Sequence, residues 1–156
     1  MNYKHLSIVF NGEVYNYKEI RKELISLGHN FVSNSDTEVV LHSFLEWGTK
    51  CVLKFIGMFA FAILDKIDEK IYLFKDRAGV KPLFYYFKNN VFMFSSELKA
   101  FHKHSKFIKE INNNAVQQYI DFGFVPSPNC IFKFCNKLDG GCLLVFDLKK
   151  KTKEIK

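Results

Sequence analysis

The sequence predicts a single layered α+β domain, on three observations. Its 156 residues suit one domain and are enough to bury a sizeable core. Hydrophobic residues make up 48% of the chain and charged residues 25%, which is typical of a globular protein. Two segments with helical periodicity come first, and short apolar runs separated by turn residues follow. Helices followed by a meander of strands favour a layered α+β architecture.

The first part of the chain predicts a strand and a helix. The apolar run at 6–10 has the length of a short strand, and the Asn-Gly pair at 11–12 is typical of a turn that stops it. Apolar residues at helical spacing predict a helix over 17–27. Asn16 and Glu19 have the spacing of a capping box at its start.

A second helix is predicted behind the segment Ser35-Asp36-Thr37-Glu38, which has the pattern of another capping box. Val40, Phe44 and Trp47 form its apolar stripe, and Gly48 follows as a stop. A further short helix is expected around 51–55.

The second part of the chain predicts strands joined by hairpins. The nearly continuous apolar run at 58–64 is typical of a strand that is covered on both faces. We expect the other strands at 71–74, 83–87, 91–94 and 142–146, short helices at 97–103 and 115–120, and a loop at Pro126 and Pro128.

The net charge is +7, and the basic residues are spread along the chain, apart from the run Lys149–Lys153. A basic run of this kind can bind nucleic acid or a membrane surface. No aromatic residue interleaves it, so it offers no stacking platform for bases, and a solvated tail is the better interpretation. We therefore expect neither nucleic acid nor membrane as a partner.

The four cysteines are Cys51, Cys130, Cys135 and Cys142. None forms a Cys-x-x-Cys pair, and no histidine stands at zinc spacing from them. A weak metal site from the last three is conceivable, but buried free thiols are the expected arrangement, and we predict no metal. No signal peptide or membrane-spanning run is visible, so a reduced cytoplasmic setting is the default expectation.

The pair Asn11 and Gly12 is the first candidate for chemistry. An Asn side-chain amide beside a Gly backbone N–H at a strand end can direct two donors at one point, as an oxyanion hole requires. Taken alone, the pair favours an ordinary hairpin turn. Asp36 is the second candidate, since its carboxylate can hold the ammonium group of an amino-acid substrate. Taken alone, it favours plain helix capping.

Two further stretches have no clear meaning alone. Lys75-Asp76-Arg77 with Gly79 and Pro82 can form a structural ion pair in a turn, line a site or face another domain. The aromatic segment 119–132 is a loop without an evident function.

Six segments together resemble the glutaminase domain of glutamine-hydrolysing asparagine synthetases. They occur in that family's order and spacing and cover nearly the whole chain: Phe-Asn-Gly-Glu-Val-Tyr-Asn-Tyr (10–17), Ser-Asn-Ser-Asp-Thr-Glu (33–38), Gly-Met-Phe-Ala-Phe-Ala (57–62), Asp-Arg-Ala-Gly-Val-Lys-Pro-Leu (76–83), Ser-Ser-Glu-Leu-Lys-Ala (95–100) and Asp-Phe-Gly-Phe-Val-Pro-Ser-Pro (121–128).

The resemblance implies an N-terminal-nucleophile fold, a four-layer αββα sandwich that is incomplete here. It also implies a reaction, in which an N-terminal Cys attacks the glutamine side-chain amide, with its own α-amino group as base. A thioester forms and is hydrolysed, and ammonia is released. In the complete enzyme a C-terminal synthetase domain then uses ATP and magnesium to amidate aspartate. No cofactor is expected in the 156-residue chain itself, and members of the family are often homodimers.

The resemblance also implies roles for individual residues. Asn11 and Gly12 match the oxyanion hole, and Asn11, Gly12 and Glu13 match part of the glutamine pocket. Asp36 matches the group that binds the substrate's α-amino group. For Asp76 and Arg77 only a structural or interface role is implied.

The departures from the family pattern are equally informative. The family opens with Met-Cys-Gly-Ile, whereas this chain opens with Met-Asn-Tyr-Lys and has no Cys before residue 51. The early strands, and with them the Arg that grips the substrate carboxylate, have no counterpart. Ala78 replaces an aromatic residue, and Leu138–Cys142 stands where the family has Leu-Pro-Pro-Gly-His. We therefore expect residues 1–156 to be a partial amidotransferase domain without a synthetase domain and without glutaminase activity.

Other interpretations remain open. The parent protein can be a related amidotransferase of the glucosamine-phosphate synthase type, or one attached to surface-polysaccharide biosynthesis. The chain can instead be a non-catalytic binding or assembly module for a separately encoded synthetase half, or a relic without function.

Overall fold

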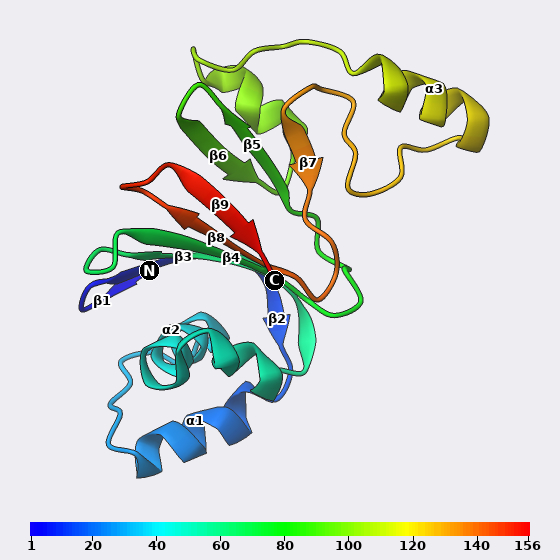
Figure 1. The fold of residues 1–156 in the computed structure, drawn as a ribbon. Coiled ribbons are helices and arrows are strands. Elements are labelled where there is room, and N and C mark those ends of the chain that lie inside the picture. Colours follow the sequence, from blue (N-terminus) through cyan, green and yellow to red (C-terminus); the bar gives the residue numbers. More distant parts are fainter.

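Two antiparallel sheets lie face to face in the computed structural model, which describes residues 1–156 (Figure 1). Sheet A consists, in spatial order, of β1 (Asn2–Tyr3), β2 (Leu6–Val14), β3 (Gly57–Asp65), β4 (Lys70–Lys75), β8 (Leu143–Asp147) and β9 (Thr152–Ile155). Sheet B consists, in spatial order, of β6 (Val91–Ser95), β5 (Phe84–Lys88) and β7 (Cys135–Lys137).

Helices cover the outer face of sheet A. These are α1 (Tyr17–Ser26), α2 (Asp36–Trp47) and the 3-10 segment η1 (Gly48–Lys54). The largest core cluster of the molecule lies between them and β2, β3 and β4, and it includes Leu24, Val40, Phe61 and Phe74. This helical layer therefore fixes the position of β2, which carries the first candidate residues.

A second core lies between the two sheets. Small side chains of β3, Ala60 and Ala62, face Leu83 and Tyr85 of the sheet B side, and Leu144 belongs to the same cluster. Because β3 contributes Phe61 and Ile63 to the first core and alanines to the second, it is buried on both faces. The prediction of a doubly covered strand at 58–64 is confirmed.

The layer outside sheet B is thin. The 3-10 segment η2 (Leu98–Lys103) packs there through Phe101, in a third cluster with Tyr86 and Phe132. The last helix, α3 (Asn113–Phe122), lies at the far corner of the molecule from α1 and α2 (Figure 1). The observed order of layers is helix, sheet, sheet, helix, which confirms the predicted αββα arrangement.

The prediction that the first strand stops at Asn11-Gly12 is wrong. β2 runs without interruption to Val14, and Asn11 and Gly12 pair with Ala60 and Phe59 of β3. The hairpin interpretation of this pair fails with it, because the chain turns into a helix only after β2 has ended.

The two predicted capping boxes differ in outcome. Ser35 caps α2, since its Oγ accepts the Thr37 N–H at 3.1 Å. Asn16 forms no side-chain cap on α1. Its amide instead bonds the backbone of Lys54 and Ile56, which ties the start of α1 to the segment before β3.

The interpretation of Lys149–Lys153 as a solvated tail is wrong in part. Residues 152–155 form β9, which pairs with β8. The Lys153 Nζ lies 4.5 Å from the centre of the Tyr85 ring, and partial burial lowers the pKa of its amino group. The Lys153 amino group therefore lies over Tyr85 of sheet B, while residues 149–153 are all exposed, so the segment is solvated but ends in a strand instead of a tail. No helix of the structure is long and apolar enough to cross a bilayer.

Candidate functional site

Asn11 lines a hollow between the two sheets. Its Nδ2 donates to the Ser96 Oγ at 3.1 Å, so an amide on β2 is tied to the segment after β6. The hollow has a volume of about 360 Å³, and the other residues along it are mainly apolar, among them Val9, Ala60 and Phe94. An Asn amide carries two N–H donors, and the bond to Ser96 uses one of them. The other remains available for a ligand in the hollow.

Gly12 allows the close approach of β2 and β3. Its φ is +139°, and a Cβ at this position would lie 2.1 Å from the Met58 carbonyl oxygen and 2.6 Å from the Phe59 Cα. Both are backbone atoms, which cannot move aside without shifting β3. Only glycine fits this position, because the backbone of residue 12 lies directly against that of β3.

The backbone of β2 is unpaired along part of one edge. Met1 and Ile8 exchange two backbone hydrogen bonds at 2.9 Å, and β1 pairs with no residue beyond Ser7. In an antiparallel strand every second residue presents its N–H and C=O to the same edge. Phe10 and Gly12 therefore face the edge that Ile8 faces, and no strand lies there.

Asp36 closes this open edge at its far end. It is the first residue of α2, and its Oδ2 accepts the Val14 N–H at 3.1 Å. Val14 is the next residue after Gly12 whose N–H points to the open edge. The structure therefore brings Gly12 and Asp36 to one edge of sheet A. Glu13 is exposed, and its side chain takes no part in an ion pair.

Sequence reasoning assigned no role to Ser96. It is separated from Asn11 by 85 positions in sequence, and only the packing of sheet B on sheet A brings the two together. The segment Ser-Ser-Glu-Leu-Lys-Ala at 95–100 was the one available signal, because it was among the matching segments.

A buried network holds the loop that precedes Asp36. Glu38 accepts the N–H groups of Val32 and Ser33 at 2.8 and 2.7 Å and the Ser33 hydroxyl at 2.6 Å. Burial alone would raise the pKa of its carboxyl, but these donors and the nearby His42 outweigh burial and hold the pKa below its usual value. The charged carboxylate therefore fixes the loop next to α2.

His42 is fully buried beside Glu38. Its ring stacks on Tyr3 and Phe31, with centroid distances of 4.1 and 4.5 Å, and its Nδ1 lies 3.0 Å from the His29 Nδ1. Burial lowers the pKa of the His42 imidazole, and the charge of His29 lowers it further. His42 is thus a neutral structural residue that joins β1, the 28–35 loop and α2.

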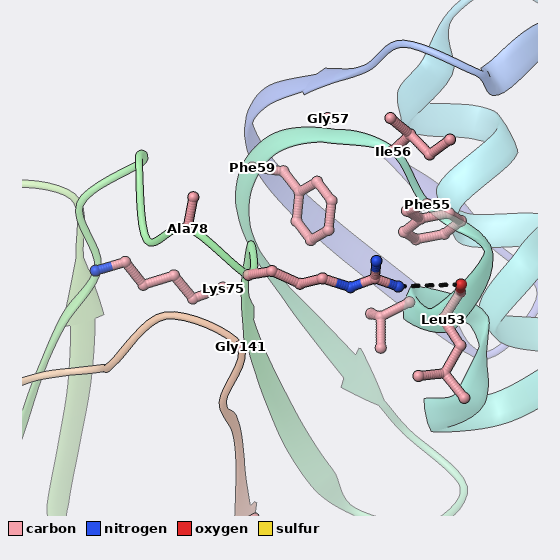
Figure 2. Close-up of a pocket in the computed structure, with 10 residues that line it drawn as sticks. Leu53, Phe55, Ile56, Gly57, Phe59, Lys75, Ala78 and Gly141 are labelled. Atoms are coloured by element: carbon pink, nitrogen blue, oxygen red, sulfur yellow. Dashed lines mark hydrogen bonds between the residues drawn. The ribbon is translucent and has the colours of Figure 1, made fainter.

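A second pocket, of about 280 Å³, lies at the start of β3 (Figure 2). Its wall is formed by Phe55 and Phe59, and Arg77 extends across it to donate to the Leu53 carbonyl at 3.3 Å. The side chain of Lys75 points away from this wall and donates to the Leu138 carbonyl.

Asp76 and Arg77 form no ion pair, so that interpretation of the turn is wrong. Asp76 is 1% exposed, and its carboxylate accepts the N–H groups of Val80, Lys81 and Phe59 at 3.0, 3.1 and 3.3 Å. Burial would raise the pKa of this carboxyl, but the backbone donors hold it below its usual value. The role of Asp76 is structural, as the resemblance implied.

No thiol lies at the open edge of β2. Cys51 belongs to the core under α2, where burial raises its pKa to about 12. Cys130 and Cys135 share the cluster outside sheet B, whereas Cys142 packs between the sheets. Because sheet B separates these thiols, the conceivable three-cysteine metal site is excluded. The chain has no cluster of three or more His, Cys, Asp or Glu side chains that can hold a metal.

Comparison with known families gives a match along almost the whole chain. The model of the glutamine amidotransferase domain matches residues 1–155. The chain belongs to this family.

The most similar relatives include several asparagine synthetases. The chain is 44% identical over 146 residues to the putative glutamine-hydrolysing asparagine synthetase 2 of Methanocaldococcus jannaschii, covering 92% of the chain and 28% of the relative. It is 38% identical over 141 residues to asparagine synthetase 3 of Bacillus subtilis, covering 90% and 23%. It therefore spans about a quarter of the length of these relatives. The predicted resemblance to an asparagine synthetase glutaminase domain is confirmed.

Solved structures share the fold. Glutamine phosphoribosylpyrophosphate amidotransferase from Bacillus subtilis, complexed with ADP and GMP, aligns with a TM-score of 0.63 and 17% identity over 97% of the chain and 28% of that protein. A structure described as the allosteric regulatory enzyme of purine biosynthesis aligns with a TM-score of 0.66, also at 17% identity. This similarity confirms the N-terminal-nucleophile type of αββα fold.

Proposed function

We propose that residues 1–156 form a partial class II glutamine amidotransferase domain whose glutamine site lies at the open edge of β2. The Gly12 N–H and the Asn11 amide stabilise the oxyanion formed on the glutamine side chain. The Asp36 carboxylate binds the α-amino group of glutamine, and Glu13 contributes to the pocket. The observation that carries the proposal is the position of Gly12 and Asp36 on one strand edge, where Val14 connects them.

The chemistry of this site needs a nucleophile that residues 1–156 do not supply. In the proposed reaction a thiolate adds to the amide carbon, and the negative charge moves to the oxygen held by Asn11 and Gly12. The terminal amine, which has taken the proton of the thiol, passes it to the nitrogen, the C–N bond breaks, and ammonia leaves a thioester behind. Water then hydrolyses the thioester to glutamate and restores the thiol.

The open edge of β2 favours a strand with an N-terminal Cys as the missing part. Phe10 and Gly12 present unpaired backbone groups there, and an added strand would satisfy them. Such a strand would also carry its first residue close to the Gly12 N–H. The 156-residue chain without this strand is therefore inactive in our proposal.

Ammonia made at this site would serve the amidation of aspartate, as the names of the relatives suggest. The synthetase part, with its ATP and magnesium, would lie in a further segment or a separately encoded partner. We also propose that the complete assembly is a homodimer, as members of the family often are.

A fused N-terminal segment tests the proposal. The part of the Methanocaldococcus jannaschii relative that precedes its match to this chain would be joined to residue 1, and ammonia release from glutamine measured. We expect release by the fusion, and a loss of roughly 100-fold or more in Asn11→Ala of that fusion, because one oxyanion donor is removed. A folded fusion that is inactive, or one that Asn11→Ala leaves unchanged, would show that the site assignment is wrong.

A non-catalytic role is the second candidate. The same open edge can pair with a strand from another polypeptide, which would make the chain an assembly module. In that case the added strand would pair with β2 equally well whether its N-terminal residue is Cys or Ser. No fusion would release ammonia.

A further inference from the structure

The Asn11 amide is the donor of the proposed oxyanion hole that can rotate. Its backbone is held by the pairing of β2 with β3, opposite Ala60, so only the side-chain torsions are free. The last torsion of an Asn side chain has no sharp preference, and rotation about it moves both N–H bonds of the amide. The Gly12 N–H, by contrast, belongs to the backbone of β2 and points where the strand directs it. The Asn11 side chain therefore needs a partner that holds it.

Ser96 is such a partner. The Asn11 Nδ2 donates to the Ser96 Oγ at 3.1 Å, and this is the only side-chain hydrogen bond in which either residue takes part. The two N–H bonds of an amide lie in one plane and point in different directions. Once Ser96 holds the first N–H, the direction of the second is fixed as well. Both residues line the hollow of about 360 Å³ between the sheets, where the second N–H is free for a ligand.

The turn after β6 keeps Ser96 in place. Ser95, the last residue of β6, pairs with Phe84 of β5, so the strand that precedes Ser96 is anchored in sheet B. The Ser95 Oγ accepts the Glu97 N–H at 3.2 Å, which closes a tight turn around Ser96. Because the backbone on both sides of Ser96 is bonded, its hydroxyl lies at a defined position relative to β2.

Ser96 lacks the partner that a nucleophilic hydroxyl needs. A serine attacks an amide when an adjacent base accepts its proton. The Ser96 hydroxyl is bonded to an amide N–H, which can only donate, and no His, Asp or Glu side chain bonds it. Its position beside an oxyanion donor is instead that of a group that acts through Asn11.

We propose that Ser96 is a positioning residue of the glutamine site, whose hydroxyl holds the Asn11 amide with its second N–H directed at the oxyanion. The inference rests on the proposed function, because it requires Asn11 to be an oxyanion donor. Donors that are held before the reaction stabilise the transition state without reorganisation, so a supporting hydroxyl contributes to the rate. Since Asp36 holds glutamine before the reaction, Ser96 should affect turnover more than substrate binding.

Kinetics of the N-terminal fusion test the proposal. We expect Ser96→Ala to lower kcat about tenfold, because a misdirected donor still contributes in part, whereas loss of the donor in Asn11→Ala costs roughly 100-fold or more. The KM for glutamine should stay within about twofold, since the hydrogen bond to the oxyanion forms only in the transition state. Ser96→Thr keeps a hydroxyl at this position and should recover most of the rate.

Ser7→Ala is the matched control. Ser7 is half-buried, as Ser96 is, and it lies on the same face of β2 as Asn11, four residues before it. Its hydroxyl bonds neither Asn11 nor Ser96. We expect the kcat of Ser7→Ala to lie within about twofold of that of the unaltered fusion.

A double variant separates positioning from a general loss of structure. If Ser96 acts only through Asn11, the combination of Asn11→Ala and Ser96→Ala should be as active as Asn11→Ala alone, because the amide that Ser96 holds is already absent. Losses that multiply in the double variant would show that Ser96 acts on another group, and would overturn the proposal.

Nuclear magnetic resonance of the 156-residue chain tests the contact without any activity. The two protons of the Asn11 amide give separate signals, and we expect the one bonded to Ser96 to exchange with water more slowly than the other. In Ser96→Ala the two rates should become similar, while unchanged backbone signals of β2 and β3 show that the fold is kept. Equal rates in the unaltered chain would overturn the proposal.

The possible results separate this inference from the proposed function. A folded fusion without activity would overturn the glutaminase site and, with it, the role of Ser96. An active fusion in which Ser96→Ala leaves kcat unchanged would overturn only the role of Ser96. Turnover of glutamine by the unaltered 156-residue chain that Ser96→Ala abolishes would make Ser96 a nucleophile, and the positioning role would then be wrong.

Discussion

At the scale of single residues, the open edge of β2 depends on Gly12. Its positive φ and its contact with the backbone of β3 leave no space for a side chain, while its N–H stays free at the edge. The same residue thus serves strand pairing and, in our proposal, oxyanion binding. This double demand explains how a turn-like Asn-Gly pair can lie within a strand.

Gly12→Ala should destabilise the fold strongly. The added Cβ would meet the Met58 carbonyl oxygen at 2.1 Å, and the strain of φ +139° adds to that collision. We expect a loss of about 3 kcal/mol or more in the free energy of unfolding, measured by urea titration. Gly28→Ala is the matched control, because its φ is +91° but nothing lies within 4 Å of its added Cβ. A similar loss in the two variants would contradict the role assigned to close strand contact.

Asp76→Ala should also be costly. The substitution leaves the N–H groups of Val80, Lys81 and Phe59 without their acceptor in a buried turn. We expect a loss of about 3 kcal/mol in thermal or urea unfolding, as for other hydrogen bonds to buried charges. Asp68→Ala in an exposed turn is the control, and a change there as large as in Asp76→Ala would contradict the account.

At the scale of elements, the helix α2 positions Asp36 through the network behind it. The His42 ring is held between Tyr3 and Phe31, and it bonds His29 on the loop before α2. Because burial keeps His42 neutral in the folded chain, this network is sensitive to acid.

The stability of the fold should fall as the pH drops below about 6.5. The pKa of His42 is lowered in the folded chain, first by burial and then by the positive charge of His29, with Lys4 and Arg21 acting in the same sense and Glu38 against it. The unfolded chain therefore binds a proton near pH 6.5 that the folded chain does not bind, and this favours unfolding. The contribution of His42 is complete above about pH 7.5.

Urea unfolding at several pH values measures this effect. One additional proton on the unfolded chain corresponds to at most about 1.4 kcal/mol per pH unit. We expect His42→Phe, which keeps a flat ring in the stack, to show a smaller slope between pH 7.5 and 5.5. A variant with the slope of the unaltered chain would show that His42 is not the group responsible.

Elements with strong local patterns were predictable from the sequence. The helix predicted over 17–27 is confirmed as α1, and the strand predicted over 58–64 lies within β3. The strands β1, β7 and β9 were missed, because each has only two to four residues and little apolar pattern. The strand β7 depends on a partner that is distant in sequence, β5, whereas β1 and the lysine-rich β9 pair with their neighbours β2 and β8.

The candidate site was predictable as residues and not as geometry. Asn11, Gly12 and Asp36 came from matching segments. That Gly12 and Asp36 share one strand edge follows only from the pairing of β2 with β3 and the contact of Val14 with Asp36. Ser96 came from no local pattern, because its contact with Asn11 crosses between the sheets. Long-range packing of this kind is not encoded in the spacing of nearby residues.

At the scale of the whole molecule, the fold combines a well-packed centre with an open strand edge. Both sheets and the helices over sheet A bury most of the large apolar residues. The edge of β2 at Phe10 and Gly12 remains uncovered, because β1 pairs only with the first residues of β2. In our account, a strand that carries the nucleophile adds to this edge.

Ammonia release from glutamine by the purified, unaltered 156-residue chain is the most direct measurement of the central claim. The claim is that these residues hold the oxyanion and substrate groups of a glutaminase without its nucleophile. The account predicts no release above background from this chain and clear release once the N-terminal segment with its Cys is joined to it. Turnover of glutamine by the unaltered chain would contradict the account, because another group would then have to attack the amide.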